Sequence, residues 1–354
     1  MRLVQTVLGC QQEPKTLFTL ICASNTQHLS QLTPAALQEP VVGCASEMAG
    51  KERPVIVGAG RISLEFVGVI PRFPAAETAS LELEEISVQV GGNAAVATGT
   101  AAALGCETRL ACKLADDFLA SFMMNALSEA NIEPYGNFGP GSRLSPMGFT
   151  VAERHSHNSH TFRTNGDAGV LNGEDLDAEK LLRDASALML DGNDPKAQLA
   201  LAKYTRGKRI PVILDCTTLS EGLTELVAQA DILICSERVA AELAPSDDTE
   251  TMLKMLKERG PKAVVVTMGE AGAVALHKET VLAQPIFNVP VVDSHGAGSV
   301  FHGAFVVALT SELPFDQCLR FASAAAALSC RRLGPWAGIP TRDEILQTAG
   351  VDSN

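Results

Sequence analysis

From Pro54 onward, short runs of apolar, largely β-branched residues alternate with stretches of helical periodicity. Six runs predict buried strands, because nearly every position in them is apolar: 55–58, 109–113, 187–191, 210–215, 231–235 and 263–267. The intervening segments predict helices at 94–104, 118–130, 197–206 and 249–259. Continuous apolar strands separated by helices are typical of a parallel sheet covered on both faces, so the pattern predicts a layered α/β fold.

Two regions depart from this rhythm. Residues 66–90 and 146–164 alternate apolar and polar positions, which suits exposed antiparallel strands. We expect these strands to form a small lid beside the main sheet.

Residues 1–53 have a different texture, with four acidic residues, four basic residues and no sustained period. They predict a poorly ordered leader or a start placed too early, since Met48 opens a segment that suits the beginning of a cytosolic α/β protein. An organellar transit peptide is the alternative, although such peptides contain few acids. We expect the folded domain to occupy residues 54–350.

Composition and charge limit the kinds of molecule that the protein is expected to bind. The 354 residues include 41 acidic and 28 basic ones, for a formal net charge of −13. An acidic chain lacks the electrostatic attraction on which diffuse binding to nucleic acid or a membrane surface relies, so we expect neither partner. Nine cysteines without a C-x-x-C pair predict reduced thiols, and hence a cytoplasmic location.

Three glycine-rich segments are candidate ligand sites, and a fourth fails on context. Residues 57–63 imitate the start of a dinucleotide-binding G-x-G-x-x-G turn, but a strand-like run follows where that motif requires a helix. Gly91, Gly92 and Asn93 open a helix, and either a ligand or a tight turn explains them. Residues 267–272 leave a strand as an amide-rich turn. Residues 293–303 are the strongest candidate, because Gly296, Ala297 and Gly298 begin an apolar helix after the strand-like run 289–292.

At these residues the chain resembles the ribokinase (PfkB) family of carbohydrate kinases, over roughly residues 54–345. The family's D-T-T-G-A-G-D signature and following F-x-G are matched by Asp293, Gly296, Ala297, Gly298, Phe301 and Gly303. Its N-terminal signature is matched by Gly91, Gly92 and the helix that ends at Leu104, and its G-D-D segment by Asp116 and Asp117. Residues 330–340 are most similar to the sulfofructose kinase branch.

The resemblance implies a three-layer Rossmann-like sandwich that binds ATP with Mg²⁺ along the C-terminal half of the sheet and a sugar under the lid. It assigns the nucleotide site to Thr267, Gly269, Gly272 and Ser236, and the sugar site to Glu65, Gly91, Gly92 and Asn93. Gly296, Ala297 and Gly298 would stabilise the transferring phosphoryl group, and Asp293 would help to form a monovalent-cation site. Lid strands of this family often pair between subunits, which implies a homodimer.

The main departure from the family lies at the general base, where Ser299 replaces the final aspartate of the signature. A serine hydroxyl does not accept a proton as a carboxylate does, and losing a general base typically removes ~10²–10⁴ in rate. His302 and His295 are candidate substitutes for this base. The N-x-x-E motif near Mg²⁺ becomes Ser236-Glu237-Arg238-Val239, and Val96 replaces a sugar-contacting asparagine.

Two further segments each allow two interpretations. Residues 155–160 contain three histidines, which fit either a metal site or the solvated turn of the lid hairpin. Arg331 and Arg332 fit either an anionic substrate group or favourable cations at a helix C-terminus.

The sequence therefore predicts an ATP-dependent carbohydrate kinase, weakened at Ser299, that phosphorylates a hydroxyl of a ketose-like or sugar-acid-like substrate. The competing hypothesis is a catalytically inactive protein that binds sugar and nucleotide and has a regulatory role.

Overall fold

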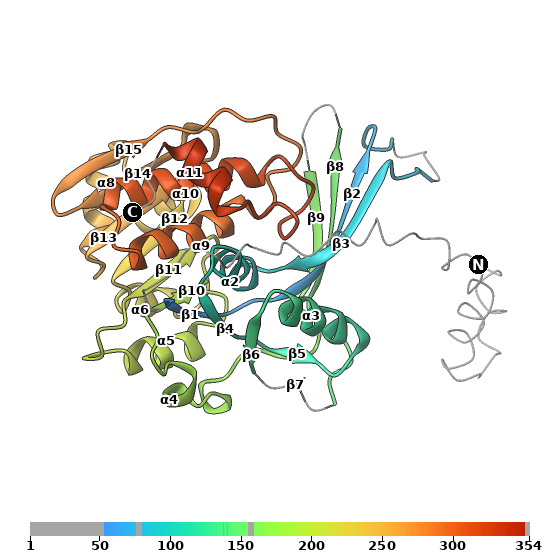
Figure 1. Ribbon diagram of the computed structural model, residues 1–354, viewed down its shortest axis with the longest axis horizontal. Coiled ribbons are helices and arrows are strands. Elements are labelled where there is room, and N and C mark those ends of the chain that lie inside the picture. Colours follow the sequence, from blue (N-terminus) through green and yellow to red (C-terminus); the bar gives the residue numbers. More distant parts are fainter. Residues whose placement is uncertain (1–52, 76–79, 137, 140, 155–158, 351–354) are drawn as a thin grey trace, which may run out of the picture. The chain divides into compact units, whose positions relative to one another are not determined.

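Nine strands form the main sheet, in the order β15-β14-β13-β12-β11-β10-β1-β4-β6 (Figure 1). The computed structural model describes residues 53–350 apart from 76–79, 137, 140 and 155–158, so the prediction for residues 1–53 lies almost wholly outside the described residues. The strands of the sheet are β1 (Val55–Ala59), β4 (Glu107–Ala111), β6 (Ile132–Tyr135), β10 (Ala187–Leu190), β11 (Val212–Cys216), β12 (Ile232–Ser236), β13 (Ala263–Thr267), β14 (Ala273–His277) and β15 (Thr280–Gln284). From β6 to β13 all neighbours are parallel, whereas β14 and β15 form an antiparallel edge.

Helices cover both faces of this sheet, and each face has its own apolar core. One core joins α2 (Asn93–Ala103), α9 (Ala297–Thr310), α10 (Phe315–Ser329) and α11 (Arg342–Ala349) to the sheet. The other core joins α4 (Ala178–Leu181), α5 (Pro195–Tyr204), α6 (Leu223–Val227), α7 (Glu237–Leu243) and α8 (Thr249–Lys257). Successive residues of a strand point to opposite faces, so Ile213 enters the first core and Leu214 the second. The predicted three-layer fold class is confirmed.

A second sheet has the strand order β3-β2-β8-β9 (Figure 1). Its strands are β2 (Ser63–Ile70), β3 (Glu85–Gly91), β8 (Met147–Glu153) and β9 (Ser159–Thr164). Each of the two hairpins is antiparallel, but β2 and β8 pair in parallel. The expectation of an antiparallel lid is therefore wrong at the central pair, because the first strand of each hairpin lies inside the sheet and both run in the same direction.

A third apolar core lies between this second sheet and α3 (Phe118–Glu129), which packs against β2, β3 and β6. Asp117 caps α3 by accepting a hydrogen bond from the Ala120 amide at 2.8 Å. The Asp117 carboxylate also accepts from the amide and hydroxyl of Ser145, which precedes β8. A small pair of strands, β5 (Leu114–Ala115) and β7 (Phe138–Gly139), adjoins this region, and two short 3₁₀ turns are η3 (Gly173–Asp175) and η4 (Gly269–Ala271).

Residues 289–292 were expected to form a strand and do not. Pro290 lacks the N–H that a ladder needs, and Val291 and Val292 are each 46% exposed. The amides of Val292 and Asp293 instead both donate to the carbonyl of Cys330, at 2.7 and 3.2 Å. This contact fixes the approach of the chain to α9.

Two further observations complete the fold. Among the residues that the structure describes, no helix combines the length and apolarity that crossing a membrane requires. Of the candidate metal site at 155–160, residues 155–158 lie outside the described residues, and the ring of His160 packs edge-on against Phe73 with ring centroids 4.6 Å apart.

Candidate active site

The candidate site lies at the carboxyl ends of the parallel strands, where the order of the sheet reverses. The chain runs outward from β1 to β4 and β6 and then returns to the other side of β1 at β10. In open α/β sheets, ligands bind in the crevice outside such a switch point. The loops that follow β1, β10, β11, β12 and β13 all begin at this edge of the sheet. Residues that are distant in the sequence are therefore brought to the same edge.

The N-terminus of α9 forms an anion cradle. Gly296 caps the helix with a φ of 85°, and a Cβ at this position would lie 2.4 Å from Pro335 Cβ, so the turn requires glycine. Within the described part of the chain, the amides of Gly298 and Ser299 donate to no backbone acceptor. A Cβ at Gly298 would meet nothing within 4 Å, so the start of the helix opens onto free space. Unpaired amides and the positive end of a helix dipole suit a phosphate group.

Asp293 ties the cradle to the loop 333–337. One carboxylate oxygen accepts from the His295 amide at 3.0 Å, and the other accepts from the Gly334 amide at 2.9 Å. The side chain is only 6% exposed. Each oxygen keeps a lone pair, so Asp293 fits the predicted cation site, although its main visible role is to fix the loop.

Gln89 of β3 joins the same loop to the second sheet. Its Oε1 accepts from the amides of Trp336 and Ala337 at 2.8 and 3.0 Å, and its Nε2 donates to the carbonyl of Leu333 at 3.1 Å. The indole of Trp336 in turn packs on Gly99 of α2, where a Cβ would lie 2.6 Å from the ring. Gln89 could not be identified from the sequence, because its partners in the loop 333–337 lie more than 240 residues away.

Ser299 lies at the cradle in the first turn of α9 and is 6% exposed. His302, one turn later, is wholly buried, and burial lowers the pKa of its imidazole to about 4. Neither ring nitrogen has a hydrogen-bond partner among the described residues. A neutral imidazole inside the core packs like an apolar side chain, so the geometry gives no support to His302 as the substitute base.

The predicted sugar-site residues come together where β2 and β3 meet the start of α2. Glu65 of β2 is 6% exposed, and its Oε1 accepts from the Ser63 hydroxyl at 2.7 Å. Gly91 ends β3, and Gly92 caps α2 with a φ of 91°. Asn93 begins α2 and donates to the hydroxyl of Thr217, after β11, at 3.0 Å. This hydrogen bond joins α2 to the loop after β11.

Three aspartates at the ends of β10 and β11 add a buried acidic group that was not assigned from the sequence. Asp191 accepts from the Arg61 amide and from Gln198 Nε2, both at 2.7 Å. Burial, with the neighbouring Asp191 charge, raises the pKa of Asp194 to about 6 and that of Asp215 to about 8. Asp191 and Asp215 are each the last residue of a predicted strand, so their position could be predicted from the sequence, whereas their burial could not.

The predicted nucleotide residues lie on neighbouring strands. Ser236 ends β12 and Thr267 ends β13, and the two are paired in the sheet. Gly269 begins the turn η4 with a φ of 55°. Gly272 ends this turn with a φ of 89°, and a Cβ there would lie 2.2 Å from the Gln284 carbonyl oxygen. At the two side-chain positions of the family's N-x-x-E motif, Ser236 caps α7 and Val239 is buried in the core. Between them, Arg238 donates to the Thr217 carbonyl at 2.7 Å.

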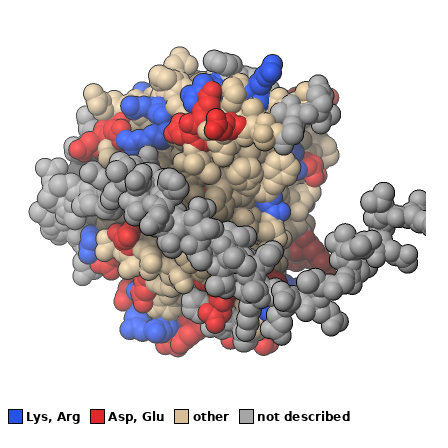
Figure 2. Space-filling model, turned by 90° about the vertical axis from the view of Figure 1, so that its right-hand side faces the viewer, with Lys and Arg blue, Asp and Glu red and all other residues tan. Residues whose placement is uncertain are grey.

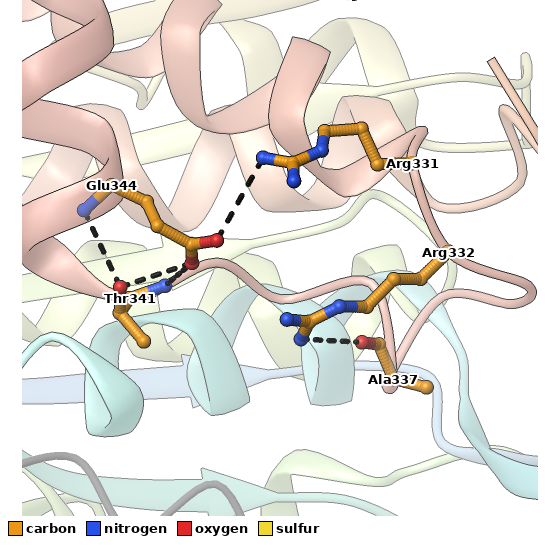
Figure 3. A network of polar contacts seen from close by, with 5 residues as sticks. All are labelled: Arg331, Arg332, Ala337, Thr341 and Glu344. Atoms are coloured by element: carbon orange, nitrogen blue, oxygen red, sulfur yellow. Dashed lines mark hydrogen bonds and ion pairs between the residues drawn. The ribbon is translucent and has the colours of Figure 1, made fainter. Parts of the chain in front are cut away.

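The side chains of Arg331 and Arg332 both contact other residues of the protein (Figure 3). The Arg331 guanidinium lies 3.8 Å from Glu344, which also closes a capping box with Thr341 at the start of α11. Arg332 donates to the Ala337 carbonyl at 3.5 Å. The structure thus favours the helix-terminus interpretation over contact with an anionic substrate.

The surface charge is mixed on the face that includes the second sheet. Figure 2 shows acidic and basic side chains interspersed there. Among the described residues, no three His, Cys, Asp or Glu side chains gather in a way that could hold a metal ion.

Comparison with known proteins agrees with this geometry. The model of the "pfkB family carbohydrate kinase" matches residues 56–342. Ribokinase from Haemophilus influenzae is 25% identical over 295 residues, covering 81% of this chain and 96% of the relative. The 2-dehydro-3-deoxygalactonokinase from Haloferax volcanii is 28% identical over 302 residues, covering 78% and 92%.

Solved structures share the fold. Arabidopsis thaliana ribokinase complexed with ribose and ATP superposes with a TM-score of 0.69 at 22% identity, covering 85% of this chain and all of that one. Other structures of the fold hold ATP with Mg²⁺. The matched residues span both sheets, the cradle and the switch point, and the chain belongs to the pfkB family of carbohydrate kinases.

Proposed function

We propose that this protein transfers a phosphoryl group from ATP to a hydroxyl of a sugar or sugar derivative, at a rate reduced by Ser299. One observation carries the proposal: the loop 333–337 connects the open amide cradle of α9 to Gln89, and Glu65, paired with Gln89 in the second sheet, keeps a buried carboxylate oxygen without a partner among the described residues. Glu65 offers an acceptor for a sugar hydroxyl, and the cradle offers donors for a phosphate.

In this reaction ATP with Mg²⁺ supplies the phosphoryl group and neutralises part of its charge. Ser236, Thr267, Gly269 and Gly272 would bind the nucleotide at the ends of β12 and β13. The amides of Gly298 and Ser299 would stabilise charge on the transferring group, with Gly296 and Ala297 holding the turn. These contributions, positioning and electrostatic stabilisation, are the largest in phosphoryl transfer and do not need a carboxylate at residue 299.

Ser299 limits the rate because the acceptor hydroxyl must lose its proton. A hydroxyl side chain can orient this proton but has no free basic site at neutral pH. The structure offers His302 only as a neutral core residue, which leaves His295, half-buried in the loop before α9, and bulk water as the candidate proton acceptors. We therefore expect turnover ~10²–10⁴ slower than a kinase with an aspartate here.

The substitution Ser299→Asp tests this proposal. We expect it to raise sugar-dependent ATP turnover by at least tenfold in a coupled assay, because the carboxylate restores the base at the cradle. Circular dichroism and calorimetric titration with a non-hydrolysable ATP analogue confirm folding and nucleotide binding in the same samples. A folded variant that binds the analogue and gains no turnover would contradict the assignment of residue 299.

The alternative function is a protein that binds sugar and nucleotide without turnover and acts in regulation. Ser299 and the loss of the N-x-x-E side chains favour it, whereas the intact cradle favours the enzyme. Analogue binding in the absence of any turnover across a sugar panel would support this alternative.

A homodimer through the lid strands stays a prediction. On the outer face of the second sheet, several apolar side chains are exposed, among them Ile86, Val88 and Phe162 at 54%, 40% and 67%. A surface of this kind suits pairing with a second copy. The cytoplasmic location and the monovalent cation at Asp293 are likewise predictions.

A further inference from the structure

One row of residues crosses the inner face of the second sheet. Gln89, Glu65, Gly148 and Arg163 are paired across β3, β2, β8 and β9, and residues paired in this way project from the same face. Gln89 is committed to the loop 333–337. The two charged members of the row, Glu65 and Arg163, are on either side of a glycine.

The glycines beside Glu65 give its carboxylate room. A Cβ at Gly91 would lie 2.2 Å from Glu65 Cγ, and a Cβ at Gly148 would lie 2.0 Å from Oε2. The carboxylate therefore extends over Gly148, in the direction of β9. Its Oε2 is buried and has no hydrogen-bond partner within the described residues. A buried carboxylate oxygen left in this state is costly, so it points to a ligand hydroxyl that would satisfy it.

Arg163 has the opposite charge and is also unused. It is exposed, and across the described chain it takes part in no ion pair or side-chain hydrogen bond. It lies close enough to Arg61 for its charge, second to burial, to lower the pKa of that guanidinium, whereas the nearby carboxylates of Glu65, Asp191 and Asp194 raise it. Arg61 donates to the side chain of Asn165 and to the Thr164 carbonyl, which holds it at the end of β9.

Arg61 already has carboxylate neighbours, so the exposed Arg163 is the guanidinium of the two that is left to pair with a ligand anion. The contrast with Arg331 and Arg332 is direct, because those two side chains are occupied by Glu344 and Ala337. Adjacent strands lie ~4.8 Å apart, so Glu65 and Arg163, two strands apart, have Cα atoms separated by roughly 10 Å. A sugar that contacts both side chains would therefore lie across Gly148, between them.

We propose that Arg163, supported by Arg61, determines specificity for a sugar that bears an anionic group, with Glu65 accepting one of its hydroxyls. The inference rests on the proposed kinase function and names its substrate class: a polyhydroxylated molecule with one carboxylate or sulfonate. A guanidinium binds either group through paired, charge-assisted hydrogen bonds. The hydroxyl to be phosphorylated lies at the opposite end of the molecule, toward the cradle.

The test is calorimetric binding to the full chain with a non-hydrolysable ATP analogue present. The probes are D-gluconate and 2-dehydro-3-deoxy-D-gluconate as carboxylates, a 6-deoxy-6-sulfonated ketose as the sulfonate, and D-fructose and D-ribose as neutral sugars. We expect one of the anionic probes to bind at least tenfold more tightly than the neutral sugars. Comparing the carboxylate probes with the sulfonate probe then shows which anionic group the protein recognises. Equal affinity for anionic and neutral probes would overturn the proposal.

Variants assign the effect to Arg163. Arg163→Gln should weaken the preferred anionic probe about 10- to 100-fold and leave the neutral sugars unchanged, while Arg163→Lys should keep part of the affinity. Arg206→Gln, which removes an exposed arginine after α5, is the matched control and should change nothing. Loss of affinity for neutral and anionic probes alike would mean a structural role and contradict the inference.

Failure of the proposed function has a different signature. If the chain binds anionic sugars through Arg163 but binds no ATP analogue, the kinase proposal fails and the substrate class stands. If it binds the analogue but Arg163→Gln alters no sugar affinity, the substrate class fails and the kinase proposal stands.

Discussion

The cradle at α9 and the inner face of the second sheet differ in how many of their polar side chains are hydrogen-bonded within the protein. At the cradle, both Asp293 oxygens and both ends of the Gln89 amide are hydrogen-bonded within the protein, and only the helix amides are left open. On the sheet, Glu65 Oε2 and Arg163 are left without partners among the described residues. A preorganised region suits a step common to all substrates, whereas an unsatisfied one suits selection between them.

The largest effect is expected from Gly296→Val, which breaks the preorganised side of this comparison. The valine would have to adopt a φ of 85° and would place its Cβ 2.4 Å from Pro335 Cβ, so the start of α9 must move. We expect affinity for the ATP analogue to fall at least 100-fold by calorimetry. The matched control is Gly207→Val, at a φ of 78° where a Cβ meets nothing within 4 Å. Unchanged analogue binding in the first variant would show that phosphate binds elsewhere.

Gln89→Leu separates the two regions from each other. It leaves the Leu333 carbonyl and the amides of Trp336 and Ala337 without their partner, and each loss of this kind costs about 1–3 kcal/mol. We expect unfolding free energy to fall by roughly 3 kcal/mol in a denaturant titration.

The chain's one tryptophan reports on the same variant. Trp336 lies in the affected loop, so its emission should shift in Gln89→Leu, with partial recovery in Gln89→Glu, which keeps an acceptor for the two amides. Gln347→Leu, at an exposed position of α11, should leave both stability and emission unchanged. Unaltered emission in Gln89→Leu would show that the loop does not depend on the second sheet.

The smallest effect is a pH dependence at Asp215, on the sheet that carries both regions. Its pKa is about 8 in the folded chain and near 3.8 when unfolded, so the unfolded state releases the proton first and stability falls as pH rises between these values. The low pKa of His302 has the opposite effect, but only below about pH 6.5. Between pH 6.5 and 8 the Asp215 cost therefore grows by about 1.4 kcal/mol per pH unit, or about 2 kcal/mol in all.

Asp215→Asn should remove this loss, so the variant should gain about 2 kcal/mol over the parent chain from pH 6.5 to 8 in denaturant unfolding. Asp184→Asn, at an exposed position, serves as the control. Parallel stability curves for parent and Asp215→Asn would show that the carboxyl group is ionised in the folded chain.

Much of the main sheet could be predicted from local pattern. The six predicted strands coincide with β1, β4, β10, β11, β12 and β13, because strands buried on both faces are apolar at nearly every position. The edge hairpin β14-β15 was not predicted, because neither of its strands is a continuous apolar run. The run 289–292 was predicted as a strand on β-branching alone, and Pro290 with the absence of a neighbouring strand overrode it.

The site divides in the same way. Sequence pattern located Gly91, Gly92, Gly296 and Gly298, because helix starts after glycine turns have a local signature. It did not locate Gln89, Arg163 or the burial of Asp215. These depend on contacts between segments far apart in the chain, which leave no periodicity.

The sequence by itself therefore determined the layered fold, the family and the amide cradle, since each follows from residues near one another in the chain. It also identified Ser299 as the departure at the base. Only the tertiary structure decided that Arg331 and Arg332 contact Glu344 and Ala337, that His302 is a core residue, and that Glu65 and Arg163 lie in one row across the second sheet. The reason is physical: hydrogen-bond satisfaction, burial and strand register are properties of packed surfaces, and they exist only once distant segments meet.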